Sequence, residues 1–470
     1  MCILLFSSES CSNYSIVLKP YLYICTTFLC LLCQAQQGGY TKGQVIDSVP
    51  VAGTNTDSYA LYLPKTFNPG VASPVVFIFD PAARGPLAAK VFRRVADIYG
   101  YILVASNNSR NGPYDANFTI ANNLFNTVLS DFKIDPKRIY TAGFSGGARL
   151  ALTIALRSGQ IQGVIACGAG FSSSGITLDP TFSYAAIVGT KDFNYSELQK
   201  TDSWLKKLHF PHVVFEFEIE HQWPFPEQLE QAFRWLQLEA YRKGLALKYS
   251  SDIRQSYQDF YQAARQAGQA NNLLLAERDY ECLIRNFAGY YTMDSLQAQV
   301  TRIRNLKEYR IQKQSWEESL VTENDLIAKY TREFEDDLEN GTPDSRKWEK
   351  YLTRLKAKYA QDTLYKQDML HRVLSALSAL AFEEASYRKD ELSREQQIFC
   401  YDICILSNPG QLYSYLRQME NYLSKGDKDM AMHYLEALIQ SGYRDFDYLK
   451  NNKTVLKLKG YPGFENIFKK

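Results

Sequence analysis

The sequence predicts an α/β protein, with a doubly wound and mainly parallel sheet in its first half and an all-α second half. Two observations carry this prediction. Between residues 58 and 241, apolar runs of strand length alternate with segments of helical periodicity. After about residue 244 the β-branched runs give way to long patterns rich in Tyr, Leu, Glu, Lys and Arg. We therefore divide the chain into a leader (1–35), a sheet domain (36–244) and a helical domain (245–470).

Composition limits the classes of function. The chain has 470 residues, of which 46% are hydrophobic, so it can form two or three domains with apolar cores. Its 53 basic and 51 acidic residues give a formal charge of +2, with no basic stripe of the kind that nucleic acid requires. We expect no nucleic-acid partner.

The first 35 residues have the features of a signal peptide. An apolar run at 21–33 follows Lys19 and Pro20, and small residues precede Gln36. The alternative, an N-terminal membrane anchor, is less favoured because the run is short for a bilayer and no stop-transfer pattern follows. We expect a periplasmic or secreted protein without a membrane span in its mature chain.

Five of the nine cysteines fall in this leader. The other four are Cys167, Cys282, Cys400 and Cys404. They have no metal-ligand spacing, so we expect neither a metal nor another cofactor. Cys400 and Cys404 share a helical face and are expected in a core rather than in a disulfide.

In chain order, the first half reads as an edge strand followed by buried strands and helices. The run 74–80 is continuously apolar, which is typical of a strand buried on both faces of a parallel sheet. Strands are predicted at 58–64, 74–80, 101–106, 139–142, 163–167, 184–189 and 212–219, and helices at 87–99, 116–132, 196–208 and 226–241, with a further helix after residue 145.

One strand-to-helix junction has the features of a nucleophile elbow. The strand 139–142 leads into Gly143-Phe144-Ser145-Gly146-Gly147, and a helical pattern starts at once. A serine in so tight a turn needs small neighbours, and the turn lifts its hydroxyl above the sheet edge. The helix start also directs backbone N–H groups to this place, where they favour a developing negative charge. We predict Ser145 as a nucleophile; the alternative is an ordinary glycine-serine turn.

Two further residues complete a catalytic triad at the same edge. Ligands of such sheets bind at the carboxyl ends of the strands, so a base and an acid should directly follow strands. Among the three histidines of this half, His221 alone follows a strand, whereas His209 and His212 precede one. Asp192 follows the strand before it. The order Ser145, Asp192, His221 is the one expected for this chemistry on this sheet.

The oxyanion of a tetrahedral intermediate needs two hydrogen-bond donors. We predict the backbone N–H of Gly146 as one donor. The second should come from the loop after the strand 74–80. Pro81 has no N–H, so we predict the N–H of Ala82 as this donor, with that of Ala83 as the next choice.

The segment Ile134-Asp-Pro-Lys-Arg-Ile-Tyr-Thr-Ala-Gly-Phe-Ser-Gly-Gly147 resembles the elbow region of α/β-hydrolases of the polyhydroxybutyrate-depolymerase and feruloyl/acetylxylan-esterase type, with dienelactone-hydrolase-like proteins as relatives. His221-Gln-Trp-Pro is similar to the sequence around the base histidine of that group. The resemblance covers roughly 58–241. It implies metal-free, serine-dependent hydrolysis of carboxylic esters, with Ser145, Asp192 and His221 at the matching positions.

Two departures from that family bear on the site. Asp80-Pro81 stands where the family usually has His-Gly, which leaves the second oxyanion donor open. The segment between 167 and 184 is too short for a full helix or lid, which favours an open cleft and an exposed or polymer-linked ester. Around this cleft, Asn107, Arg110 and Trp223 are predicted to bind substrate. Their alternatives are a solvated loop for the first two residues and packing under the His221 loop for Trp223.

In the second half, helices are predicted at 252–266, 272–287, 306–338, 345–359, 363–387 and 394–406. Near the end, the spacing of Tyr415, Tyr422, Gly426 and Ala431 resembles a tetratricopeptide repeat with helices at 411–424 and 430–441. A poorer match begins at residue 257 and turns at 268. Such helix pairs form a concave surface for a protein partner. A helical domain that only supports the sheet domain is the equal alternative.

These observations favour an exported serine hydrolase that cleaves a small-molecule or polymer-linked carboxylic ester through an acyl-enzyme. Two alternatives stay open. In the first, the sheet domain has lost catalysis and the helical half binds a protein partner, as the Asp80-Pro81 departure suggests. In the second, the same triad serves a serine peptidase.

Overall fold

The computed structural model describes residues 39–171, 181–340 and 343–468. The predicted signal peptide and the loop segment 172–180 therefore lie outside the described residues. The first half contains one eight-stranded sheet with the order β1-β2-β4-β3-β5-β6-β7-β8. Its strands are β1 Val45–Pro50, β2 Ser58–Tyr62, β3 Ser73–Phe79, β4 Ile102–Ser106, β5 Ile134–Phe144, β6 Gly163–Cys167, β7 Ser183–Gly189 and β8 His212–Phe217.

The sheet is mixed at one end and parallel elsewhere. β1 and β2 pair antiparallel with their neighbours, and all pairs from β4 through β3 to β8 are parallel. The predicted edge strand is in fact the second strand, because β1 lies outside it. β1 was missed because only Val49 of its six residues is buried, so it lacks the apolar alternation by which a strand is recognised.

Helices cover both faces of the sheet, as a doubly wound architecture requires. Alternate residues of the buried strands point to opposite sides: Val76 and Ile78 join one core, whereas Val75, Phe77 and Phe79 join the other. The first core receives α2 and α6, and the second receives α3, α4 and α5. These helices are α2 Gly85–Tyr99, α3 Tyr114–Asp131, α4 Gly146–Ser158, α5 Tyr195–Lys207 and α6 Pro226–Arg242.

The rest of the described chain is helical. It contains α7 Ser250–Gln269, α8 Leu273–Phe287, α9 Asp294–Asn305, α10 Lys307–Glu339, α11 Ser345–Tyr359, α12 Leu364–Tyr387, α13 Arg394–Ser407, α14 Leu412–Ser424, α15 Lys428–Gln440, α16 Phe446–Asn451, α17 Lys453–Leu456 and α18 Phe464–Ile467. The two helices of the predicted repeat correspond to α14 and α15, which pack together around Met419 and Leu435. The repeat character of the whole half stays a prediction.

The apolar core does not stop at residue 244. Phe215 and Trp235 of the first half share one cluster of buried side chains with Phe260 of α7, Leu283 of α8 and Tyr309 of α10. Burial of such side chains contributes about 25 cal/mol per Å² of apolar area, so α7 to α9 help to stabilise the sheet. Separate clusters follow at 330–404 and 415–467.

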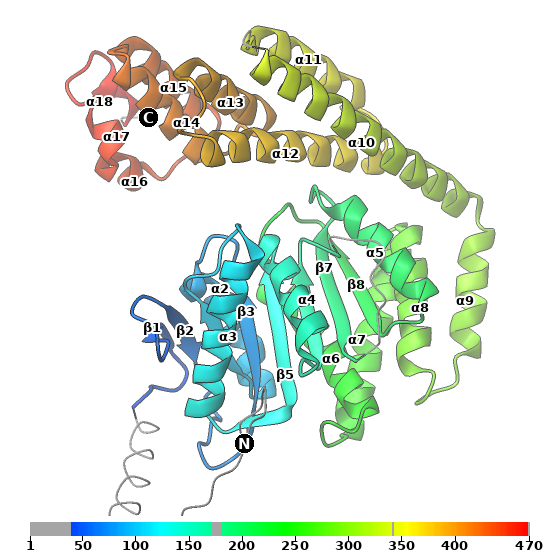
Figure 1. Ribbon diagram of the computed structural model, residues 1–470. Coiled ribbons are helices and arrows are strands. Elements are labelled where there is room, and N and C mark those ends of the chain that lie inside the picture. The colour runs from blue at the N-terminus through cyan, green and yellow to red at the C-terminus, as the bar shows by residue number, and fades with distance from the viewer. Residues whose placement is uncertain (1–38, 172–180, 341–342, 469–470) are drawn as a thin grey trace, which may run out of the picture.

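The long helix α10 leads from the core that contains α7 to α9 to the cluster at 330–404, and α12 runs beside it in the same direction, above the sheet (Figure 1). All four cysteines of the described residues are free and buried, and Cys400 and Cys404 lie in the apolar cluster at 330–404, in a core and without a disulfide as predicted. Among the helices described, none has both the length and the apolar character needed to cross a membrane.

Candidate active site

The elbow places Ser145 between the end of β5 and the start of α4. The backbone of Ser145 has a positive φ, with φ 51° and ψ −122°. Residues other than glycine rarely adopt such a conformation. The turn also packs closely against β3, since a methyl carbon on Gly147 would lie only 2.1 Å from the carbonyl oxygen of Phe79. The glycine at this position is therefore required by the approach of two backbones.

The structure brings the three predicted triad residues into one hydrogen-bonded chain. His221 Nε2 lies 3.0 Å from Ser145 Oγ, and His221 Nδ1 lies 2.9 Å from Asp192 Oδ1. Asp192 follows β7 and His221 follows β8, so both stand at the carboxyl edge of the sheet, as predicted. In this arrangement the imidazole can accept the serine proton while the carboxylate holds its tautomer.

The surroundings fix the acid and the base. Asp192 is 1% exposed, and its Oδ1 also accepts a hydrogen bond from the backbone N–H of Asn194 at 2.8 Å. The imidazole of His221 lies between the rings of Phe144 and Phe193, with centroid distances of 4.6 and 4.1 Å. These contacts hold the ring in the orientation that proton transfer from Ser145 to His221 requires.

The two predicted oxyanion donors differ in availability. The N–H of Gly146 begins α4 and has no hydrogen-bond partner within the described ranges. The N–H of Ala82, in contrast, donates to Asp80 Oδ1 at 2.8 Å, and that of Ala83 donates to the Asp80 carbonyl at 3.1 Å. Neither is free in this structure, so the prediction of Ala82 needs correction. The Ala82 N–H is engaged because the Asp80 side chain is buried beside it, and a sequence pattern does not predict the direction of that side chain.

Asn111 lines the same cleft as Ser145 and Gly146. The segment around it pairs with the loop after β3, through an Ala82–Arg110 bridge and a hydrogen bond from Asn111 N–H to the Pro81 carbonyl at 2.8 Å. A methyl carbon on Gly146 would lie 1.9 Å from Asn111 Oδ1, so the side-chain amide sits directly over the start of α4. Rotation of this amide exchanges its oxygen and its NH₂ group. No sequence motif singles out this residue.

Asp80 organises the loops on the other side of the triad. It is 1% exposed and accepts hydrogen bonds from Arg84 Nε at 2.9 Å and from Trp223 Nε1 at 2.8 Å. Burial alone would raise its pKa, but the hydrogen bonds from Arg84, Trp223 and Ala82 outweigh it and lower the pKa. Since Trp223 is two residues after His221, Asp80 ties the base loop to β3.

A cleft of about 380 Å³ opens beside Ser145 and Gly146. Of the three residues predicted to bind substrate, only Arg110 lines it. Asn107 points elsewhere, because its Nδ2 donates to the Asp47 carbonyl and to Ser58 Oγ, both at 3.0 Å. Trp223 packs against Phe144 and Phe92, which corresponds to the alternative interpretation of that residue.

The helical half contributes to this cleft through Glu383 of α12. The expectation of an open cleft therefore has to be revised: an element nearly 240 residues after Ser145 in the chain forms part of the wall. Another wall residue, Arg149 of α4, is paired with Glu197 of α5 at 2.6 Å. The described residues bring together no group of three His, Cys, Asp or Glu side chains that would hold a metal ion.

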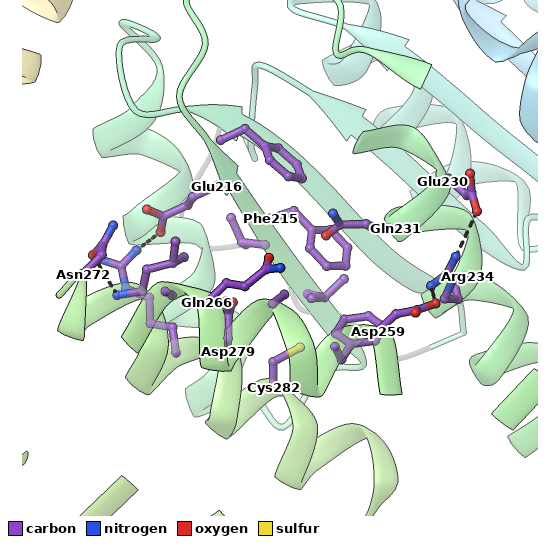
Figure 2. A pocket seen from close by; sticks show the side chains of 18 of the residues that line it. Phe215, Glu216, Glu230, Gln231, Arg234, Asp259, Gln266, Asn272, Asp279 and Cys282 are labelled. Carbon is purple, nitrogen blue, oxygen red and sulfur yellow. Dashed lines mark hydrogen bonds and ion pairs between the residues drawn. The ribbon is translucent and has the colours of Figure 1, made fainter. Parts of the chain in front are cut away.

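A second cavity of about 660 Å³ lies between β8 and the pair α7–α8, and none of the predicted site residues lines it. In Figure 2, Gln266 and Asp279 of these helices lie beneath Phe215 of β8. Arg278 of α8 forms an ion pair with Glu216 of β8. Burial and the charge of Glu216 raise the pKa of Asp279 to about 7, although Arg278 lowers it.

The sheet order and the strand-elbow-helix junction together define an α/β-hydrolase architecture. No family model matches the chain, and no curated protein matches it. Similar solved structures include a thermostable esterase with 17% identity and a TM-score of 0.33, aligned over 41% of this chain and 62% of that one. The chain thus spans less than two thirds of that esterase.

Two other similar structures are covered more completely. A ferulic acid esterase has 15% identity and a TM-score of 0.34, over 40% of this chain and 94% of that one. A hyperthermophilic esterase from the archaeon Pyrobaculum calidifontis has 17% identity and a TM-score of 0.31, over 47% and 92%. At scores of this size the likeness carries no argument about activity, which has to rest on the site itself.

Proposed function

We propose that the protein is a serine hydrolase that cleaves carboxylic esters through an acyl-enzyme. The observation that carries this proposal is the continuous chain from Ser145 Oγ through His221 to Asp192, with distances of 3.0 and 2.9 Å. In this mechanism Ser145 attacks the ester carbonyl while His221 takes its proton and then returns it to the leaving alcohol. Water, activated by the same imidazole, releases the acid.

The oxyanion is stabilised by the N–H of Gly146 and by the side-chain NH₂ of Asn111 in this proposal. Two facts support the second assignment: the amides of Ala82 and Ala83 are engaged by Asp80, and the Asn111 amide lies over Gly146 in the same cleft. A preorganised donor at this place acts most strongly when the negative charge develops in the transition state.

The test is Ser145→Ala. We expect it to abolish hydrolysis of p-nitrophenyl acetate and labelling by a fluorophosphonate probe, because both need the serine hydroxyl. Equal labelling of wild type and variant would place the nucleophile elsewhere. A folded wild-type protein that neither labels nor hydrolyses any ester would instead favour the scaffold hypothesis, in which the helical half binds a protein partner.

The peptidase alternative uses the same three residues. Matched p-nitrophenyl ester and p-nitroanilide substrates with one acyl group separate the two activities; we expect the ester to be cleaved and the anilide not. We further propose that the protein is exported, on the evidence of its leader pattern. N-terminal sequencing of the secreted or periplasmic protein should then start at Gln36.

A further inference from the structure

The helical half is anchored to the loop that holds the catalytic acid. Arg372 of α12 is 2% exposed, and its Nη1 donates to the carbonyl of Thr190 at 2.6 Å, two residues before Asp192. Its Nε also donates to Glu323 of α10 at 2.7 Å. The guanidinium group further stacks on the ring of Tyr195, 4.7 Å from its centroid. A buried charge with these partners fixes the position of α12 over the sheet edge.

Glu383 lies on the same face of α12 as Arg372. The two residues are 11 positions apart, which is close to three helical turns, or ~16 Å along the helix axis. Since Arg372 faces the sheet domain, Glu383 faces it too, and it lines the cleft together with Ser145 and Phe193 (Figure 1 shows the course of α12). The anchor and the cleft residue thus belong to one rigid element.

The carboxylate of Glu383 has no hydrogen-bond partner among the residues described. Partial burial raises the pKa of Glu383, and the charge of Arg149 lowers it. Arg149 is already paired with Glu197 at 2.6 Å, and His221 is held between Ser145 and Asp192. These groups therefore leave the negative charge of Glu383 largely uncompensated at the cleft wall.

The other carboxylate of the cleft offers a contrast. Both oxygens of the Asp80 carboxylate accept hydrogen bonds from the protein, so this carboxylate is not available to a substrate. Glu383 is free to bind a group that enters from solvent. A carboxylate so placed attracts a positive charge and repels a negative one.

We propose that Glu383 binds a positively charged amine or ammonium group of the substrate, so that the preferred esters carry a cation near the scissile bond. The proposal rests on the serine hydrolase function proposed above. It also gives the helical half a direct part in substrate selection, beyond support of the sheet domain.

The experiment compares the full-length protein on sets of esters that differ only in charge. For the acyl side, the p-nitrophenyl esters of 6-aminohexanoate, hexanoate and adipate are cationic, neutral and anionic. For the leaving group, acetylthiocholine is compared with the neutral 3,3-dimethylbutyl thioacetate. The readout is the ratio of kcat/KM for the cationic ester to that for its neutral counterpart.

We expect a ratio of about 10 to 100 in at least one set, which corresponds to about 1.4–2.7 kcal/mol of attraction between the carboxylate and the cation. Glu383→Gln should bring that ratio close to 1, and Glu383→Lys should favour the adipate ester. Glu384→Gln is the matched control, because Glu384 neighbours Glu383 on α12 but pairs with Arg388 away from the cleft. It should leave the ratio unchanged.

A wild-type ratio near 1 in both sets, a preference for the anionic ester, or a ratio that survives Glu383→Gln would each overturn the proposal. These outcomes differ from a failure of the proposed function. In that case no ester is hydrolysed and Ser145 is not labelled, whatever the residue at position 383.

Discussion

Replacing Asn111 with alanine tests the least conventional part of the proposed site. The proposed site has two donors to the oxyanion, the N–H of Gly146 and the Asn111 amide, so Asn111→Ala removes one of two. Loss of one such donor typically lowers kcat by about 10² to 10³, or about 2.7–4 kcal/mol of transition-state stabilisation. KM should change little, because the interaction forms only as the negative charge develops.

The stability of the protein should not change with this substitution. The Asn111 side chain is exposed, and its backbone N–H still donates to the Pro81 carbonyl in the variant. A loss of activity without a change in Tm therefore separates a catalytic effect from a folding effect. The assay is steady-state hydrolysis of p-nitrophenyl acetate, with the rate of fluorophosphonate labelling as a second measurement.

Two further variants sharpen the test. Asn111→Asp keeps the shape but replaces the donor by a carboxylate that repels the oxyanion, so it should be less active than Asn111→Ala. Asn122→Ala, at an exposed position of α3, is the control and should match wild type. The reasoning is refuted if Asn111→Ala keeps kcat within about threefold of wild type while Ser145→Ala is inactive.

Three other substitutions, one of them with a matched control, test packing and charge at the elbow, at Asp80 and in the second cavity. Gly147→Ala would bring a methyl group 2.1 Å from a β3 carbonyl oxygen, so it should lower the free energy of unfolding by about 1–3 kcal/mol and reduce activity. Gly289→Ala is the control: its added methyl group would have no atom within 4 Å, so the free energy of unfolding, measured by denaturant titration for both variants, should change by less than about 0.5 kcal/mol. Asp80→Asn should lower both Tm and kcat/KM, because the charged hydrogen bonds to its arginine and tryptophan partners are weakened by about 1.5–3 kcal/mol; an unchanged Tm and kcat/KM would contradict the role given to this carboxylate. Asp279 has a folded-state pKa raised to about 7, so its ionisation costs stability as pH rises from about 4 through 7. Asp279→Asn should therefore raise Tm more at pH 8 than at pH 4, and a difference that does not depend on pH would show that this carboxyl group titrates normally.

The sequence was informative where function follows the order of strands. Ser145, Asp192 and His221 were selected because each directly follows a strand, and the structure places their side chains within hydrogen-bond distance. The parallel sheet makes this possible, since it brings all carboxyl ends of its strands to one edge. Their catalytic role remains the proposal that the Ser145 variant tests.

The orientation and partners of side chains that depend on tertiary contacts could not be predicted in this way. Ala82 was chosen from its position after β3, but its N–H is bound by the Asp80 carboxylate, and only the fold shows that this side chain turns inward. Asn107 follows a strand like the triad residues, yet it bonds to β1 and β2. Glu383 reaches the cleft because α12 lies over the edge of the sheet, a contact that no local pattern encodes.

The core that continues past residue 244 has a consequence for how this chain folds during synthesis. When residue 244 leaves the ribosome, one face of the sheet still lacks the side chains of α7 to α9 and Tyr309 that complete it. At about 5–20 residues per second, the ribosome needs about 3 to 13 more seconds to deliver them. One apolar face of the nascent sheet therefore stays exposed during this interval. A chaperone that recognises such surfaces should bind the nascent chain at this stage.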